Sequence, residues 1–296
     1  MSHKLVLRFD IDTHKCIRNG VPNLLDLAEK YDVPFTFFLN TGRAVALFDS
    51  MFKKNKNEGI ALASEVQPAM MTARQKLGNA DFLQAAILNP RLTHYKKQIL
   101  RLWRSNCEMG IHGGRNHALW QKYGATWGYD KTRDEIEWAL KQIRWIIPEY
   151  TPFGFLSPGW NSTSELDAVL YDLGFLYCAD MRCADEKCTQ KECALEECAN
   201  NGCTLVDESR PIYYLGTNLF HKSGTEAFFE GCREKGFDDE AILKIVADSI
   251  ERNEITVLYD HPYFSGIQEL DMIEKIIVKA KKMGVEIIAM KDMISE

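Results

Sequence analysis

The feature that most constrains this chain is an alternation of short apolar runs with helix-period segments along most of its length. Short apolar runs bounded by turn residues are typical of strands, and apolar residues at 3.6-residue spacing are typical of helices. The expected strands are 5–9, 34–39, 109–112, 153–156, 175–178, 211–214, 256–259 and 286–289. The expected helices are 21–31, 93–106, 131–147, 164–173, 239–253 and 268–283.

This alternation predicts an α/β fold built on a parallel sheet. About eight strand candidates favour a distorted or incomplete (β/α) barrel of about seven to eight parallel strands. An open doubly wound sheet is the alternative, although no glycine-rich phosphate fingerprint follows the first strand. We expect a single domain over residues 1–296, with a helical insertion at 43–91 and a Cys-rich insertion at 178–203.

Composition excludes several other classes of protein. The chain is 46% hydrophobic and 26% charged, as expected for a globular domain with a sizeable core. A formal net charge of -6 argues against a nucleic-acid surface. No secretory signal and no apolar run of the ~20 residues that a membrane span needs are evident. Nine cysteines without an export signal indicate reduced thiols or metal ligands, hence a cytoplasmic location.

Two carboxylates stand at the end of the first apolar run, where Asp10 and Asp12 flank Ile11. Alternate side chains of a strand share a face, so both acids point the same way. Two adjacent acids there are costly unless something relieves their repulsion. They could be solvated turn residues, they could hold a cation, or one could be a metal ligand and the other a proton acceptor.

Polar side chains also follow several other expected strands. His112 ends one strand and His117 follows it, Asp180 and Arg182 follow another, and His261 follows the strand at 256–259. The loop Pro158-Gly159-Trp160 follows the strand at 153–156, and a tryptophan in such a loop is placed to stack on a sugar. Because the carboxyl ends of parallel strands meet at one face, we expect these groups to form one site.

One carboxylate and two imidazoles are a ligand set for zinc (Zn²⁺) or a similar ion, and they leave positions open for water and substrate. Such an ion acidifies its bound water and polarises a carbonyl group. A neighbouring carboxylate can then accept the proton of the water, and a histidine opposite can protonate a leaving nitrogen. These parts together predict hydrolysis of an amide.

At these positions the chain resembles the NodB-homology polysaccharide deacetylases. The motifs are Arg-Phe-Asp-Ile-Asp, then Ile-His-Gly-Gly-Arg-Asn-His, and finally Leu-Tyr-Asp-His-Pro. The resemblance implies that Asp10 is the catalytic base and His261 the general acid. It implies that Asp12, His112 and His117 bind a divalent metal, zinc first, with cobalt, nickel, manganese or iron as alternatives.

Within that family the chain looks most like the branch of formamido-arabinose phosphoundecaprenol deformylases. The shared features are the segment that begins Gly20-Val21-Pro22, the long insertion at 43–91, Trp120, and Pro158-Gly159-Trp160. The resemblance implies removal of an acetyl or formyl group from an amino sugar that is lipid-linked or nucleotide-linked. A polyprenyl-linked substrate implies peripheral contact with the inner face of a membrane. The residues expected to contact substrate are Trp120, Trp160, Asp180 and Arg182.

Departures from the branch pattern leave parts of this assignment open. His112 and His117 are five residues apart, where the branch has four, and the intervening glycines can absorb the extra residue. Asn161 stands where the branch has an arginine, and related enzymes use an arginine to orient the base. We therefore expect either that Arg182 or Arg115 takes that role or that substrate recognition differs from that of the branch.

Six cysteines recur at a five-residue period: Cys178, Cys183, Cys188, Cys193, Cys198 and Cys203. Neither a helix nor a strand places residues with this spacing on one face, and zinc sites usually contain closer cysteine pairs. One alternative function is therefore a Cys-rich metal-binding or redox protein. Another is an inactive carbohydrate-binding module on a deacetylase scaffold. The sequence leaves the oligomeric state open.

Overall fold

The fold is that of a computed structural model, which describes residues 3–46, 82, 83, 85, 87–180, 203–205, 211–219 and 227–294. For 203–205 only the backbone is described. Arg182, most of the insertion at 43–91, and the cysteines at 183, 188, 193 and 198 lie outside these residues. In the described part, no helix combines the length and the hydropathy that crossing a membrane requires.

The described strands form one curled sheet with the order β6-β7-β5-β4-β3-β2-β1-β8, and β9 pairs with the start of β1. Their bounds are β1 Lys4–Ile11, β2 Thr36–Leu39, β3 Glu108–His112, β4 Gly154–Leu156, β5 Tyr177–Cys178, β6 Cys203–Leu205, β7 Tyr213–Leu215, β8 Ile255–Asp260 and β9 Glu286–Ile287. Seven strands from β7 to β8 run parallel, which confirms the incomplete barrel, and β6 adds an antiparallel edge that we did not predict.

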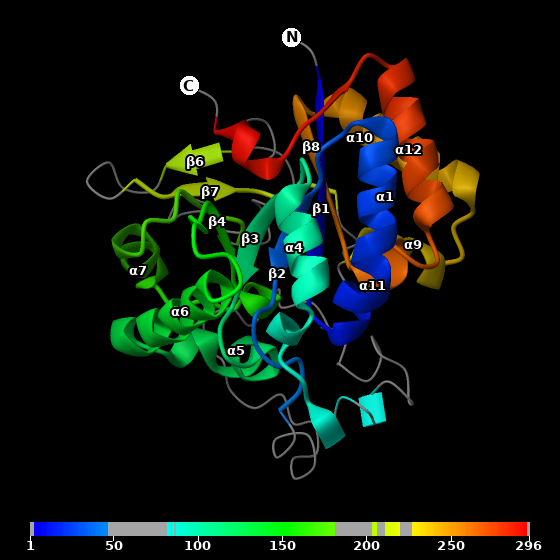
Figure 1. The fold of residues 1–296 in the computed structure, drawn as a ribbon. Coiled ribbons are helices and arrows are strands. Elements are labelled where there is room, and N and C mark those ends of the chain that lie inside the picture. The colour runs from blue at the N-terminus through cyan, green and yellow to red at the C-terminus, as the bar shows by residue number, and fades with distance from the viewer. Residues whose placement is uncertain are drawn as a thin grey trace.

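Helices cover the outside of the curled sheet, as Figure 1 shows for α1, α4 and α12. Their bounds are α1 Val21–Tyr31, α4 Lys96–Arg104, α5 His117–Tyr123, α6 Tyr129–Arg144, α7 Leu166–Asp172, α9 Phe228–Glu234, α10 Asp239–Arg252, α11 Pro262–Ser265 and α12 Leu270–Lys282. Shorter helical turns occur at Cys16–Gly20, Leu92–His94, Gly124–Thr126, Pro158–Trp160 and Met290–Met293. The six expected helices are present: α1 has the expected bounds, and the other five have shifted ends. The shorter α5, α9 and α11 were not predicted.

Strand β1 separates two layers of apolar packing, because its alternate side chains face opposite sides of the sheet. Leu5, Leu7 and Phe9 face the helices and belong to the main core. Val6 faces the interior of the curled sheet, where it packs in a smaller cluster. Parallel strands that are covered on both sides are commonly apolar throughout. The buried, charged Arg8 on the inner face of β1 is an exception to this pattern.

The two end strands of the parallel set, β7 and β8, are joined by a short seam after β7. Leu219 accepts a hydrogen bond from the amide of Tyr259 (3.2 Å) and donates one to the carbonyl of Val257 (3.0 Å). The side-chain carbonyl of Asn218 accepts from the amide of Val257 at 2.8 Å. Residues 218–219 thus supply strand-like pairing along β8 and bring the curled sheet close to a closed barrel.

The amino ends of the strands surround a buried carboxyl group, that of Glu108. Tyr177 donates to its Oε1 at 2.7 Å, and Thr36 and the amide of Lys291 donate to its Oε2 at 3.1 and 2.9 Å. Burial raises the pKa of Glu108, although these hydrogen bonds act in the opposite direction. The cluster attaches the C-terminal turn at Met290–Met293 to this end of the sheet, because Thr36 also accepts from the amide of Met290.

The two ends of the insertion at 43–91 lie side by side. Arg43 forms an antiparallel bridge with Arg91 and a parallel bridge with Asn116. Ala44, Val45 and Ala85 form a small buried cluster beside this point, against which Phe82 packs. The described ends of the insertion therefore lie next to the loop that carries His117.

Candidate active site

The polar groups expected to form a site lie at the carboxyl end of the sheet. In Figure 1 both chain termini lie at one end of β1, and α5 and α11 lie toward the other. Asp10 and Asp12 come from the end of β1, His112 from the end of β3, and His261 directly follows β8. The structure brings these groups together, as a parallel sheet requires.

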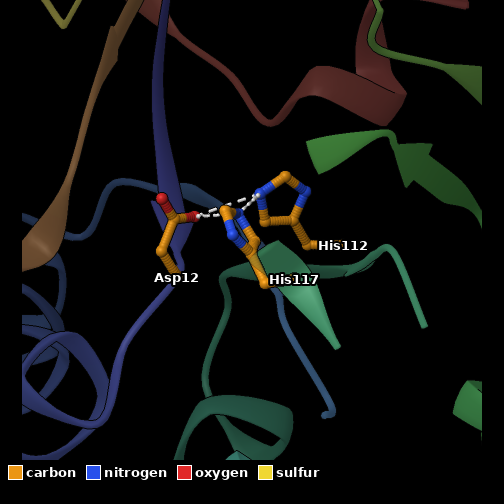
Figure 2. A group of neighbouring side chains, drawn as sticks. All are labelled: Asp12, His112 and His117. Carbon is orange, nitrogen blue, oxygen red and sulfur yellow. Dashed lines mark hydrogen bonds and ion pairs between the residues drawn. The ribbon is translucent and has the colours of Figure 1, made fainter. Parts of the chain in front are cut away.

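Three buried side chains converge at the centre of this end (Figure 2). Asp12 Oδ1 lies 3.0 Å from His112 Nε2 and 3.2 Å from His117 Nε2. The two Nε2 atoms are 3.1 Å apart. The exposed fractions of the three residues are 3%, 2% and 6%, so all three donor atoms are held away from bulk water.

Local hydrogen bonds orient the two imidazoles. His112 Nδ1 lies 3.0 Å from the carbonyl oxygen of Leu156, so this nitrogen carries the proton and the lone pair is on Nε2. Gly113 has φ +72°, a conformation that glycine adopts without strain, and it turns the chain after β3. Asn116 then caps α5 by accepting from the amide of Leu119, which places His117 in the first turn. The five-residue spacing is therefore accommodated by a glycine turn and a helix cap.

The three donor atoms fit a metal ion. Ligands at ~2.0–2.2 Å around a tetrahedral ion are separated by roughly 3.3–3.6 Å, and the separations here are 3.0–3.2 Å. Two nitrogens that face each other and one carboxylate oxygen form a mixed N/O donor set that suits zinc and related divalent ions. Asp12, His112 and His117 would hold the ion.

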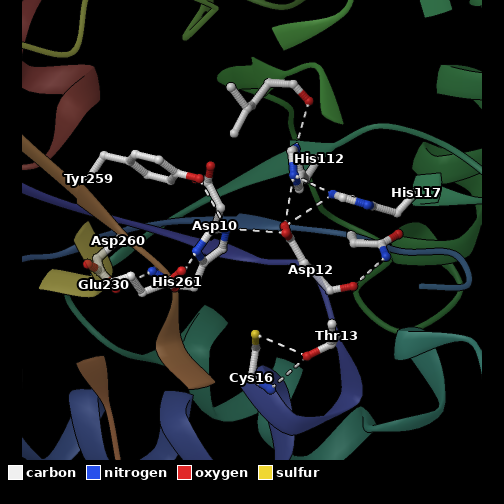
Figure 3. A network of polar contacts seen from close by, with 12 residues as sticks. Asp10, Asp12, Thr13, Cys16, His112, His117, Glu230, Tyr259, Asp260 and His261 are labelled. Atoms are coloured by element: carbon white, nitrogen blue, oxygen red, sulfur yellow. Dashed lines mark hydrogen bonds and ion pairs between the residues drawn. The ribbon is translucent and has the colours of Figure 1, made fainter. Parts of the chain in front are cut away.

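Asp10 is held by Arg8, an arginine of its own strand. In Figure 3, Asp10 lies near Tyr259 and Asp12. Arg8 Nε and Nη2 donate to the two carboxylate oxygens of Asp10 at 3.2 and 3.0 Å. Burial opposes the charge of Arg8, but the attraction of Asp10 outweighs it, so the pKa of Arg8 is raised and its guanidinium keeps its charge. The expectation that Arg115 orients Asp10 is wrong, because the Arg115 guanidinium pairs with Asp134 at the surface.

Hydrogen bonds and aromatic rings hold the Arg8 guanidinium in place. Its Nη1 donates to the carbonyl of Ala179 at 3.1 Å and to Thr217 Oγ1 at 2.7 Å. Three aromatic rings surround the guanidinium, with centroids 5.2, 5.9 and 4.9 Å from Cζ: Phe38, Trp160 and Tyr259. An arginine with this many contacts holds the Asp10 carboxylate in one position.

His261 lies between the metal-ligand group and a second carboxylate. Its Nδ1 is 2.8 Å from Glu230 Oε1, and its Nε2 is 3.3 Å from Asp12 Oδ2 and 3.1 Å from the hydroxyl of Tyr259. The loop after His261 packs closely on the turn before α1, because a Cβ on Gly20 would lie 1.9 Å from the carbonyl oxygen of Pro262. The Gly20-Val21-Pro22 segment seen in the sequence therefore supports the loop that carries His261.

A second group of possible ligands, Glu230, Asp260 and His261, has a structural explanation. Asp260 Oδ1 accepts from the amide of His261 and from Ser265 Oγ, and its Oδ2 accepts from the amide of Phe229. These bonds commit Asp260 to holding β8, α9 and α11 together. Burial and the nearby Glu230 raise the pKa of Asp260 to about 7.

The residues expected to contact substrate occupy different environments. Trp160 is half-buried and has φ +50°, an uncommon conformation that directs its ring over Arg8 and Tyr259. Asp180 is 1% exposed, and its Oδ1 accepts from the amide of Ser157. Trp120 is in the main core with 1% exposure, so its ring has no free face for a sugar and the expectation of substrate contact is corrected. Arg182 lies outside the described residues.

Sequence reasoning missed three residues that the structure places at the site: Arg8, Glu230 and Tyr259. Arg8 and Tyr259 could have been found, because each lies two residues before a predicted reactive residue and therefore shares its face of the strand. Glu230 gave no such signal, since it lies on α9, a helix far away in the sequence.

Comparisons with known proteins show the family of this chain. The family model described as polysaccharide deacetylase matches residues 2–178. A curated relative, named as the probable 4-deoxy-4-formamido-L-arabinose-phosphoundecaprenol deformylase ArnD of Shewanella sediminis, is 25% identical over 185 residues. The alignment covers 60% of this chain and 57% of that relative.

Solved structures share the fold. A Mycobacterium smegmatis protein assigned to the polysaccharide deacetylases has a TM-score of 0.60 at 13% identity, covering 99% of this chain and 89% of that one. A Pseudomonas aeruginosa PAO1 protein with the same assignment has a TM-score of 0.54 at 13% identity, covering 98% and 88%. The family match spans more than half of the chain, so the protein belongs to the polysaccharide deacetylase family.

Proposed function

We propose that this chain is a metal-dependent hydrolase that removes an N-acyl group, formyl or acetyl, from an amino sugar. The observation that carries the proposal is the convergence of Asp12, His112 and His117 within 3.0–3.2 Å, beside a base and an acid on neighbouring strands. Asp10 is the base and His261 the acid. Burying polar and charged groups is costly, so five of them would not be buried together if they were only solvated turn residues. The five are Asp10, Asp12, His112, His117 and His261.

The roles follow from the contacts of each side chain. A divalent ion held by Asp12, His112 and His117 would polarise the amide carbonyl and acidify water. Asp10, held in place by its ion pair with Arg8, accepts the proton of the attacking water. His261, whose Nδ1 contacts Glu230, donates a proton from Nε2 to the departing amine nitrogen. The acyl carbon–nitrogen bond breaks, and a carboxylate and a free amine are the products.

The proposed substrate class is inferred from the name of the curated relative. The curated relative is named for a formamido-arabinose joined to phosphoundecaprenol, which supports an amino sugar carried on a lipid phosphate. Trp160, beside Arg8 and Tyr259, would contact the sugar. Such a substrate places the enzyme in the cytoplasm, peripheral to the inner face of the membrane. The insertion at 43–91 would accept the lipid, since its described ends meet the loop of His117.

The test measures metal content and amine release together. The purified chain is loaded with zinc and supplied with N-formyl and N-acetyl amino sugars, free and lipid-linked. We expect Asp12→Ala to lose the metal and to reduce amine release by about 10⁴-fold or more. His94→Ala is the matched control, because His94 is an exposed histidine outside the group formed by Asp12, His112 and His117, and should behave as wild type.

Full amine release by metal-free Asp12→Ala would contradict the proposal. Absence of amine release by the zinc-loaded wild type would favour an inactive binding module instead. The Cys-rich alternative is tested in the same measurement, because thiol-bound metal would persist in Asp12→Ala and disappear when the cysteines of 183–203 are changed to serine.

A further inference from the structure

Three backbone segments meet beside the loop that carries His117, at the two described ends of the insertion. The amide of Arg43 donates to the carbonyl of Arg115 at 3.0 Å, and the amide of His117 donates to the carbonyl of Arg43 at 2.8 Å. On its other side, Arg43 forms an antiparallel bridge with Arg91. The backbone of Arg43 therefore lies between Arg91 and the segment that leads to His117, one of the proposed metal ligands.

Arg43 and Arg91 are a pair of like charges. Opposite residues of an antiparallel bridge have Cβ atoms about 4.5–5.5 Å apart, and two like charges placed in this way repel each other. Both arginines are exposed. In the part of the chain that the structure describes, no carboxylate forms an ion pair with either guanidinium. The fold alone therefore gives no reason to place two arginines opposite each other here.

Arg115, the third arginine at this place, is in a different situation. Its guanidinium donates two hydrogen bonds to the carboxylate of Asp134, at 2.8 and 3.0 Å, and lies 3.2 Å from Glu135 Oε1. Its charge is therefore matched by the protein, and its side chain is committed to α6. Arg43 and Arg91 have no such partners among the described residues, so theirs are the charges left to receive an anion.

Trp138 holds Arg91 without neutralising it. The Arg91 Cζ lies 5.3 Å from the centroid of the Trp138 ring, and this ring packs against the main core. The face of an aromatic ring attracts a cation without adding a negative charge. A guanidinium held in this way keeps the N–H groups of its edge for a phosphate, whose oxygens match the planar fork of arginine.

Resting on the proposed function, we propose that Arg43 and Arg91 bind a phosphate ester carried by the amino-sugar substrate. The oxygens of a phosphate supply the negative charge that relieves the repulsion between two guanidiniums. The pair adjoins the backbone of His117, so the phosphate would lie beside the group that faces the reacting amide. Arg43 and Arg91 are also the described ends of the insertion proposed to accept the lipid, so sugar, phosphate and lipid follow one another in the order of such a substrate.

A matched pair of substrates tests the assignment in turnover. The zinc-loaded chain is assayed on an N-acyl amino sugar with and without a phosphate ester at its anomeric carbon. We expect the phosphate to raise kcat/KM of wild type by about 10- to 100-fold, as charge-assisted hydrogen bonds would. The double variant Arg43→Gln, Arg91→Gln should reduce this gain to about two-fold or less, through KM. Arg104→Gln is the control, since Arg104 is an exposed arginine in the last turn of α4, and it should keep the gain.

A binding measurement does not depend on turnover. Glucose 1-phosphate and glucose are titrated calorimetrically into the full chain carrying Asp12→Ala, where loss of the metal removes a competing site for phosphate. We expect the phosphate ester to bind more tightly than glucose, and the double variant to weaken its binding by about 10-fold or more. The double variant should also unfold at an equal or higher urea concentration, because it removes the repulsion between the arginines. A purely structural pair would lower that concentration instead.

The outcomes separate this site from the proposed function. Equal kcat/KM for the two sugars in wild type, or a gain that survives in the double variant, would overturn the phosphate site and leave the hydrolase intact. Equal binding of glucose and glucose 1-phosphate would also overturn it. Loss of amine release from every substrate in wild type would overturn the proposed function, whereas the titration with glucose 1-phosphate would still decide whether the arginines bind phosphate.

A membrane lipid is the other source of a phosphate ester, and vesicles distinguish it from the substrate. Wild type and the double variant are sedimented with vesicles of phosphatidylglycerol, and we expect the two to bind alike. A double variant that lost vesicle binding but kept its preference for the phosphorylated sugar would overturn the assignment, because the arginines would then bind a lipid headgroup.

Discussion

The two ends of the same curled sheet each bury a carboxylate cluster, and the two clusters are built differently. At the amino end, Glu108 accepts from Tyr177, Thr36 and the amide of Lys291, all of which are fixed parts of the fold. At the carboxyl end, Asp12 is surrounded by the Nε2 atoms of His112 and His117, which together with it form a donor set for a divalent ion. The first cluster is satisfied by donors of the protein itself, whereas the second has the composition of a metal-binding group.

This difference explains how one sheet can be both stable and reactive. A buried carboxyl group whose acceptors are matched by donors ties elements together, as Glu108 ties the C-terminal turn to β2 and β3. A buried group whose neighbours present lone pairs instead creates a place for a cation. Changes at the carboxyl end should therefore affect chemistry more than folding, and changes at the amino end the reverse.

The largest expected effect is a loss of activity without a loss of metal, when the base is removed and the metal ligands are kept. Asp10→Asn should lower kcat by about 10²- to 10⁴-fold because the base is lost, while zinc content stays at the wild-type value. Single-turnover amine release and metal analysis of the same sample measure both. Glu108→Gln serves as the control at the opposite end of the sheet and should keep wild-type kcat.

The next effect concerns the arginine that holds the base. Arg8→Lys keeps a positive charge but cannot bridge both oxygens of Asp10, so we expect kcat to fall by about 10- to 100-fold. Arg115→Lys is the matched surface control and should leave kcat unchanged. Equal kcat values for the two variants would show that Arg8 does not orient the base.

At the amino end the expected effect is on stability. Glu108→Ala leaves Tyr177 and Thr36 without their buried acceptor, so the free energy of unfolding should fall by about 2–3 kcal/mol. Glu108→Gln can still accept from Thr36 and donate to Tyr177, and should cost less than half of that. Urea denaturation checks both variants. A loss of metal in Glu108→Ala below the unfolding transition would contradict the separation of the two ends.

The smallest effect is a pH dependence of stability. Because burial raises the pKa of Glu108 in the folded state, its stabilising contribution is full below the unfolded pKa of ~4.3 and is lost as pH rises through the folded pKa. We expect the free energy of unfolding of Glu108→Gln to decline less with rising pH than that of wild type. Parallel declines would show that Glu108 does not contribute.

Much of this arrangement was predictable from sequence, because strands and their ends are local signals. The eight expected strands and the convergence of Asp12, His112 and His117 follow from apolar runs that end in polar residues. The edge strand β6 was not predicted because it has three residues and lies beside a cysteine-rich segment. The roles assigned to Asp10 and His261 stay predictions until the variants are measured.

Contacts between distant segments were the part that sequence could not supply. Glu230, the carboxylate beside His261, is such a contact, because it comes from α9 and no motif relates that helix to the end of β8. The partner of Asp10 was sought in a loop, although Arg8 lies two residues earlier on the same face of β1 and could have been found from that spacing. Trp120 was expected to contact substrate from its place after the histidine loop, but α5 turns its side chain into the core. Which side of a short helix is buried depends on neighbours that a motif does not specify.

The seam at residues 218–219 has a consequence for the behaviour of the protein in solution. An unpaired edge of a parallel strand is a template for pairing with another chain. Here the backbone of Leu219 and the side chain of Asn218 take up backbone groups of β8 that would otherwise be unpaired. Two residues therefore protect the strand that leads to His261 from edge-to-edge association, without the need for a further strand.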